Sequence, residues 1–249
     1  MSAQPNQSAA EADIIRVLAE LAGAASAPHA GSYAFQPAAD ARVMRQVARL
    51  AGPHAAAAVR LWRAVCAEHM RAAGLSQVLL AGGDPVATTE AARAFFGFST
   101  PVLRLPAVRD ALERALDSPG QVACLPWPEQ AGPGQWWPML NESRFRDLSI
   151  LAGWPGFPAG EGEPACAMVG WGPPSASGTD ETLMTAHDDS RLAERTLGEI
   201  GLGGEVVARA RSLALLKIPS FIAADDPRLE LARRSGLEGL RIIGVRPCP

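Results

Sequence analysis

The residues of this chain best suited to chemistry are arginines in its first third. Arg42, Arg45 and Arg49 stand at positions i, i+3 and i+7, so they share one face of a predicted helix. A guanidinium group is a planar cation that binds a carboxylate through two parallel hydrogen bonds. This face is therefore a candidate site for an organic acid. The alternative is a solvated basic face on an amphipathic helix.

Three further groups of polar residues have both a functional and a structural interpretation. Arg60 and Arg63 could bind an anion, although long arginine stems often cover apolar neighbours. His187-Asp188-Asp189 could hold a metal ion, but such residues just before a helix are more often a capped turn. Asp225-Asp226-Pro227 is typical of a helix start.

The composition argues against several classes of protein. The formal net charge of -3 and the pI near 5.8 give no electrostatic footprint for nucleic acid. No apolar run reaches the ~20 residues that span a bilayer, and residues 1–11 lack the pattern of a signal peptide. We therefore expect a cytoplasmic protein without nucleic-acid or membrane partners.

The cysteines give no sign of a metal site or a disulfide framework. None of them has a partner at the short spacing of a zinc motif. We expect reduced thiols, no metal and no cofactor. The cysteines are Cys66, Cys124, Cys166 and Cys248.

Residues 11–74 have the periodicity of helices. Apolar residues recur at three-to-four spacing in three runs, which predicts three helices. Breaks at 28–32 and at Gly52-Pro53 separate them. The periodic residues are Ile14, Ile15, Leu18 and Leu21, then Val43, Val47 and Leu50, then Val59, Trp62, Val65 and Met70.

From Gln77 onward the period changes to short strands that alternate with helices of about three turns. This alternation favours parallel α/β units. The predicted strands are 77–81, 101–105, 121–125 and 146–152, with a helix at 107–116 and a linker rich in Gly and Pro at 153–164.

The last segment predicts a second type of unit. Its expected elements follow the β-α-β-β-α-β order of a ferredoxin-like module. They are a strand at 166–171, which continues or restarts at 182–184, a helix at 190–200, a strand pair at 206–224, a helix at 227–235 and a strand at 240–245.

Several segments carry a resemblance to a known family. They are Phe35-Gln36-Pro37 with Arg60-Leu61-Trp62-Arg63, the helix at 91–97, the strand end at 122–129, and residues 221–229. With these segments the chain resembles a shortened and divergent member of the bacterial chorismate mutase and prephenate dehydratase proteins (P-proteins) of the phenylalanine branch.

The resemblance implies an α+β fold of several modules. A helical chorismate-mutase-like module would occupy residues 1–74. An α/β three-layer lobe that resembles half of prephenate dehydratase would occupy 75–158, and a ferredoxin-like, ACT-like βαββαβ module would occupy 159–249.

The resemblance also implies a reaction and a set of site residues. Rearrangement of chorismate to prephenate requires a site that holds a compact dicarboxylate with cations and fixed donors. Arg16 stands near the place of a family arginine and Asp40 near that of a glutamate; with Arg42 they form the candidate catalytic set. Glu68 or His69 stands near the place of a family glutamine, and most of the family's carboxylate clamp is absent or replaced. The candidate substrate-binding residues are Arg45, Arg49, Arg63 and Glu68.

The dehydratase reaction itself is not expected. Ser143-Arg144-Phe145 resembles the family's threonine-arginine-phenylalanine motif, but only about a dozen residues separate Glu129 from Ser143, too few for a second lobe. Without that lobe the substrate cleft has no second wall. We therefore interpret Ser143 as a residue that caps or precedes a strand. Trp136 and Trp137 are expected either to fill the uncovered face of the lobe or to mark a partner surface.

Three hypotheses follow from the sequence. The first is a chorismate mutase-related isomerase with a degenerate site, assembled as a homodimer through the helical module. The second is a non-catalytic pseudoenzyme that binds a small aromatic-pathway carboxylic acid or serves a regulatory role. The third is a purely structural scaffold. Fold-level analogy alone does not decide among them.

Overall fold

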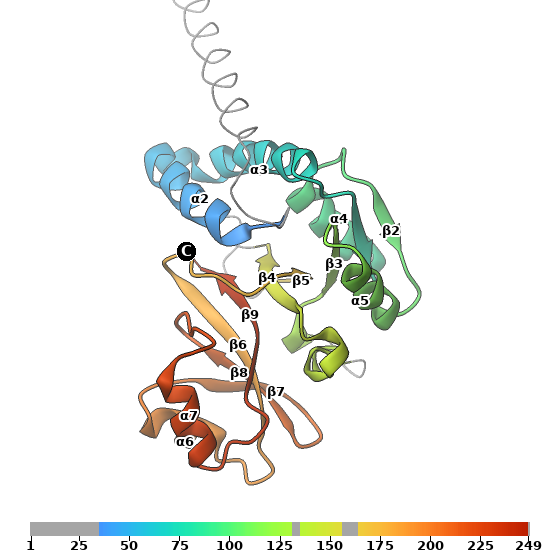
Figure 1. Cartoon of the computed structure of the whole chain (residues 1–249). Helices are drawn as coiled ribbons and strands as arrows, with labels where there is room; N and C mark the ends of the chain where they lie inside the picture. Colours follow the sequence, from blue (N-terminus) through green and yellow to red (C-terminus); the bar gives the residue numbers. More distant parts are fainter. Residues whose placement is uncertain (1–34, 131–134, 156–163, 249) are drawn as a thin grey trace, which may run out of the picture.

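The computed structural model describes residues 35–130, 135–155 and 164–248, which form a mixed α/β structure on one large sheet (Figure 1). The strands are β1 (Gln77–Leu80), β2 (Val102–Arg104), β3 (Gln121–Pro126), β4 (Leu148–Trp154), β5 (Cys166–Trp171), β6 (Asp180–His187), β7 (Glu205–Ala210), β8 (Leu213–Ile218) and β9 (Arg241–Pro247). They lie in the order β2-β1-β3-β5-β4-β9-β6-β8-β7.

The helices are α2 (Pro37–Ala51), α3 (Ala55–Ala72), α4 (Pro85–Phe96), α5 (Val108–Asp117), α6 (Ala193–Glu199) and α7 (Pro227–Arg234). Short 3-10 turns are η1 (Gly52–His54), η2 (Pro128–Gln130), η4 (Trp137–Asn141) and η5 (Ser143–Phe145). The first predicted helix, with Arg16, lies outside the described residues. Of the helices in the described ranges, none combines the length and apolar character needed to cross a bilayer.

The parallel strands β2, β1 and β3 form the outer part of the first half of the sheet, with β2 at its edge. Alternate residues of β1 and β3 point to opposite faces, and both faces are covered. Leu79 and Leu125 pack with α5 on one face, whereas Val78 and Val122 pack with α3 and α4 on the other. Burial on both faces explains why these strands are continuously apolar in sequence.

The helix α4 has clear signals at both of its ends. Asp84 caps the amino end, because its carboxylate accepts a hydrogen bond of 2.7 Å from the Ala87 amide, and Pro85 occupies the first turn. Gly97 ends the helix with φ +76°, a conformation that favours glycine. A Cβ atom at Gly97 would lie 2.9 Å from the Cβ atom of Ala67, so the glycine also lets α3 approach α4.

Helices α2 and α3 form an antiparallel pair at the positions where two helices were predicted (Figure 1). The apolar stripe used to predict α2 is not its buried face. Val43 and Leu50 are 38% and 80% exposed, whereas Ala41, Met44 and Ala48 are buried with Val59 of α3. Alanines have no bulk beyond Cβ and allow two helix backbones to pack closely, so on α2 Ala41 and Ala48, together with Met44, form the contact in place of Val43 and Leu50.

One strand has a different partner from the expected one. The sequence places Cys166–Trp171 at the start of the C-terminal segment, but β5 pairs antiparallel with both β3 and β4 in the first half of the sheet. That prediction was wrong. An apolar period identifies a strand but not its neighbours, and β5 is buried on both faces because α3 and α4 cover one side and α5 the other.

The C-terminal segment contributes the antiparallel strands β9-β6-β8-β7 with the chain order β6-α6-β7-β8-α7-β9. Helices α6 and α7 cover one face of this part of the sheet. The opposite face, with Leu183 and Leu215, packs against the segment that holds Trp136 and Trp137. Both tryptophans are buried, which confirms that they fill a face of the sheet.

The two halves of the sheet meet where β4 runs parallel to β9, with Ile150 opposite Gly244. A Cβ atom at Gly244 would lie 2.5 Å from the carbonyl oxygen of Ile150. The strands can therefore approach this closely only because position 244 has no side chain. The hydrophobic core continues across the junction, since Ile150 and Ile243 belong to the same cluster.

We predict that Gly244→Ala destabilises the protein by about 1–3 kcal/mol, because the methyl group must displace β9 from β4. Denaturant unfolding monitored by tryptophan fluorescence measures this change. Gly198→Ala is the control: no atom lies within 4 Å of a Cβ at that helical position, so it should be neutral or stabilising by up to about 1 kcal/mol. Equal stability of the Gly244→Ala variant and the native chain would contradict the account of the junction.

Candidate functional site

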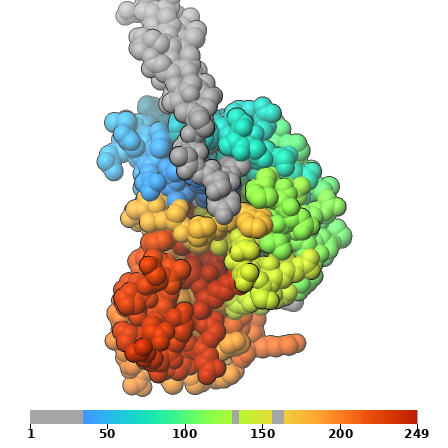
Figure 2. Space-filling view, in the orientation of Figure 1, coloured from blue at the N-terminus to red at the C-terminus, as the bar shows by residue number. Residues whose placement is uncertain are grey.

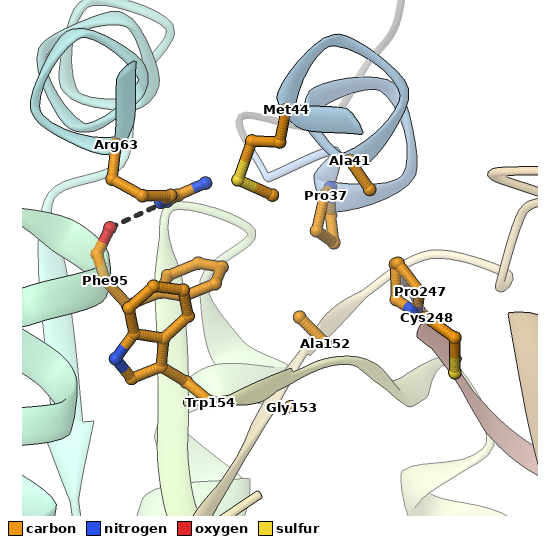
Figure 3. Close-up of a pocket in the computed structure, with 10 residues that line it drawn as sticks. All are labelled: Pro37, Ala41, Met44, Arg63, Phe95, Ala152, Gly153, Trp154, Pro247 and Cys248. Carbon is orange, nitrogen blue, oxygen red and sulfur yellow. Dashed lines mark hydrogen bonds between the residues drawn. The ribbon is translucent and has the colours of Figure 1, made fainter. Parts of the chain in front are cut away.

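A small cavity lies where the helical pair, the first half of the sheet and the end of β9 meet (Figure 3). Its volume is about 30 Å³. We call it the Arg63 cavity, after its charged lining residue. The lining residues are Pro37, Ala41, Met44, Arg63, Phe95, Ala152, Gly153, Trp154, Pro247 and Cys248.

Arg63 occupies a core position of α3. It lies on the same helical face as Val59, Cys66 and Met70, which are all buried, and its own side chain is only 2% exposed. A basic residue inside an apolar helical stripe is unusual, because burial of a charge costs free energy unless the charge is paired and hydrogen-bonded. The position of Arg63 within this stripe is the sequence signal that marks it.

The guanidinium group of Arg63 is held by Phe95 (Figure 3). Its Nη2 atom donates a hydrogen bond of 2.7 Å to the Phe95 carbonyl oxygen. Its Cζ atom lies 3.9 Å from the centroid of the Phe95 ring, in the range of a cation–π interaction. Nε and Nη1 are buried without a hydrogen-bond partner among the described residues.

Aromatic rings fix the position of Phe95 in turn. The ring makes edge-to-face contacts with Phe35 at 5.9 Å and with Trp154 at 5.5 Å between centroids. Such pairs add stability beyond the area that they bury. Phe95 and Trp154 form the aromatic wall of the cavity, and neither was predicted as a site residue, because the segments that carry them meet only in the tertiary structure.

Asp40 is the anion nearest to Arg63. Its Oδ2 atom lies 3.5 Å from Nη1 of Arg63, which is an ion pair without a hydrogen bond. Asp40 also accepts a hydrogen bond from Cys66, and the pKa of that thiol is raised to about 12 by burial and by the charge of Asp40. At neutral pH this thiol is therefore protonated and is not a nucleophile. The available chemistry is ion pairing and hydrogen bonding.

Arg45 and Arg42 are not among the residues that line the cavity, and both donate hydrogen bonds to the chain that links β5 to β6. Figure 2 shows this link, in yellow-orange, between the helices and the C-terminal part. Arg45 donates to the carbonyl oxygens of Ser177, Thr179 and Cys248 at 2.7–2.8 Å and to the Ser177 hydroxyl at 2.6 Å. Arg42 makes one exposed hydrogen bond of 3.0 Å, to the Ala176 carbonyl.

The other predicted site residues lie apart from Arg63. Arg49 is exposed, and Glu68 pairs at the surface with Arg71 at 3.0 Å. Arg16 lies outside the described residues. Of the predicted set, the structure thus brings together Arg63 and Asp40.

The remaining motifs have structural roles. Asp188 accepts hydrogen bonds from the Leu192 and Ala193 amides and pairs with Arg209 at 2.7 Å, so it caps α6. Asp226 caps α7 by accepting from the Arg228 amide at 2.9 Å. In the described ranges, no group of three or more His, Cys, Asp or Glu side chains is arranged to hold a metal ion.

The residues Ser143, Arg144 and Phe145 form η5, just before β4. Arg144 pairs with Glu113 of α5 at 2.8 Å, and Phe145 is fully buried. Ser143 is exposed and precedes the strand, as the structural interpretation expects.

Comparison with known proteins does not identify a family. No protein-family model and no curated protein matches the chain. Among solved structures, it is similar to GqqA, described as a novel type of quorum quenching acylase, with 15% identity and a TM-score of 0.44 over 69% of this chain and 95% of that one. It is similar to prephenate dehydratase from Streptococcus mutans with 10% identity and a TM-score of 0.43, over 69% and 97% of the two chains. Similarities this distant carry no argument about function.

We predict that Arg45→Met lowers the free energy of unfolding by about 2–4 kcal/mol, because it leaves several partly buried acceptors without their charged donor. Arg42→Met on the same helix should change it by less than about 1 kcal/mol, because that side chain makes a single exposed hydrogen bond. Urea denaturation of the two variants measures the difference. Similar small effects of both substitutions would show that Arg45 does not hold the link in place.

Proposed function

We propose that the chain is a non-catalytic binding protein that holds a small carboxylic acid at the Arg63 cavity. The observation that carries this proposal is that Arg63 lines the cavity while its Nε and Nη1 atoms have no hydrogen-bond partner within the described part of the chain. Each unmatched buried polar group costs about 1–3 kcal/mol, and more if it is charged. A carboxylate supplies the charge and the acceptor oxygens that match a guanidinium.

The size of the cavity limits how the acid binds. Its volume of about 30 Å³ is close to the share of one molecule in liquid water, roughly 30 Å³, so it admits a carboxylate group but not an aromatic ring. The body of the ligand would extend between Pro37 and the Pro247–Cys248 end of the lining (Figure 3). Pro37 and Pro247 at this end are apolar, so they favour an acid with an apolar or aromatic body, the class that the family resemblance implied.

Binding is proposed rather than catalysis because the lining offers one charge. Among the described residues that line the cavity, Arg63 is the only charged side chain. Rearrangement of chorismate requires that two carboxylates be held, and the hydrogen bonds of Arg45 direct its guanidinium to protein carbonyls instead. The alternative, a chorismate mutase with Arg63 and Asp40 in its site, is favoured by their approach to 3.5 Å. Prephenate dehydration is not proposed.

The modular organisation and the oligomeric state are also proposals. The element order of the C-terminal part supports an ACT-like module, and the pairing of β5 with β3 and β4 supports a boundary between β5 and β6 rather than at residue 159. A homodimer through the helical part is supported by the exposed Val43 and Leu50 on α2. Sedimentation velocity, which gives the mass in solution, would contradict the dimer if it found a single chain.

We predict that an aromatic or apolar carboxylic acid raises the melting temperature of the native chain and not that of Arg63→Met. Binding to the folded state must stabilise it, by about 2.7 kcal/mol at a ligand concentration of 100 Kd. The test set is chorismate, prephenate, phenylalanine, tyrosine, benzoate and 3-phenylpropionate, with benzamide as the neutral control.

Two further variants control for the loss of an arginine and for misfolding. Arg60→Met removes an exposed arginine of the same helix and should leave binding unchanged. Arg63→Lys keeps the charge, so it should fold and bind more weakly. Acids that stabilise Arg63→Met as well as the native chain would overturn the proposed site. Loss of chorismate absorbance above the spontaneous rate would instead favour the isomerase.

A further inference from the structure

We infer that Asp40 makes the Arg63 cavity selective for acids that carry a hydrogen-bond donor, a hydroxyl or an ammonium group, next to their carboxylate. The inference rests on the proposed function and names the ligand class of the same site. It follows from the position of Asp40, from its charge, and from the nature of its contact with Arg63.

Asp40 belongs to the helical face that forms the cavity. Pro37, Ala41 and Met44 of α2 line the cavity, and Asp40 lies three residues after Pro37 and four before Met44, on the same face. Its side chain is 19% exposed, so it is largely removed from the solvent that would screen its charge. A carboxylate that reaches Arg63 therefore comes close to a second, fixed carboxylate.

The contact between the two residues leaves Arg63 only partly satisfied. Asp40 Oδ2 lies 3.5 Å from Nη1, and none of the residues that the structure describes forms a hydrogen bond with Nη1. The anion is thus near enough to repel a ligand carboxylate but does not occupy the donors of the guanidinium. The Arg63 cation attracts a ligand carboxylate and the Asp40 anion repels it. A site of this kind distinguishes ligands, because repulsion weakens the binding of some acids more than that of others.

A donor next to the ligand carboxylate removes this repulsion. A hydroxyl or ammonium group on the neighbouring carbon can donate to Asp40 while the carboxylate accepts from Arg63. A plain acid has no such group, and a dicarboxylic acid adds another negative charge. Among the described lining residues Arg63 carries the only charge, and Asp40, which is not itself a lining residue, is the anion that stands 3.5 Å from it, so these two residues together set the preference.

Titration calorimetry with 3-phenyllactate and 3-phenylpropionate tests the inference, because the two acids differ by the hydroxyl group alone. We expect the native chain to bind 3-phenyllactate about tenfold more tightly. In Asp40→Asn the repulsion is absent, so 3-phenylpropionate should gain affinity and the preference should fall to less than about threefold. Asp40→Glu keeps the charge and should still favour the hydroxy acid.

The outcomes separate two claims: that Asp40 sets the selectivity, and that Arg63 binds the carboxylate. Equal binding of the two acids by the native chain, or a preference that persists in Asp40→Asn, would overturn the role of Asp40 while leaving Arg63 as a carboxylate site. Failure of the native chain to bind 3-phenyllactate would also overturn it. Binding of both acids by Arg63→Met would instead remove the proposed function. A single cooperative thermal transition of Asp40→Asn without ligand verifies that this variant is folded.

Discussion

The close approach of β4 and β9 at Ile150 and Gly244 is the constraint on which the rest of the structure depends. It joins two groups of strands into one sheet, because a side chain at position 244 would collide with the Ile150 backbone. The same approach carries the end of β9 to the helical pair, where Pro247 and Cys248 complete the wall of the Arg63 cavity. The hydrogen bond from Arg45 to the Cys248 carbonyl then holds that end against α2. A backbone contact in the sheet therefore positions a side-chain site at its edge.

Arg63 carries a charge at a buried position, and burial of a charge costs free energy. Its guanidinium lies on the Phe95 ring and donates to the Phe95 carbonyl, yet two of its nitrogens remain unmatched and its counter-ion stands 3.5 Å away. Replacement of such a group by an apolar residue is often neutral or stabilising in proteins, so stability alone does not account for it. The proposed role of Arg63 in binding an anion would account for it. Arg45 is the contrasting case, since its donors meet protein acceptors and its role is to hold the chain together.

The sequence predicted most of the helices and strands, but it did not predict which strands pair with one another. Strands such as β1 and β3 were predictable because they are apolar throughout, and α4 because Asp84 and Gly97 mark its ends. The pairing of β5 was missed, because periodicity contains no information about partners. The buried face of α2 was missed because Ala41, Met44 and Ala48 form it, and alanines do not stand out in an apolar pattern. At the site, Arg63 and Asp40 were named in advance, whereas Phe95 and Trp154 belong to segments that only the tertiary fold brings together.

The most direct test of the central claim observes the Arg63 side chain itself. Nitrogen-15 NMR of arginine-labelled protein resolves the Nε–H signals, and the signal absent from Arg63→Lys identifies Arg63. We predict that this signal shifts saturably as 3-phenyllactate is added, because a carboxylate enters the cavity beside Nε and Nη1. A signal that stays unchanged while the acid binds elsewhere, or that responds equally to benzamide, would contradict the assignment of Arg63 as a carboxylate site.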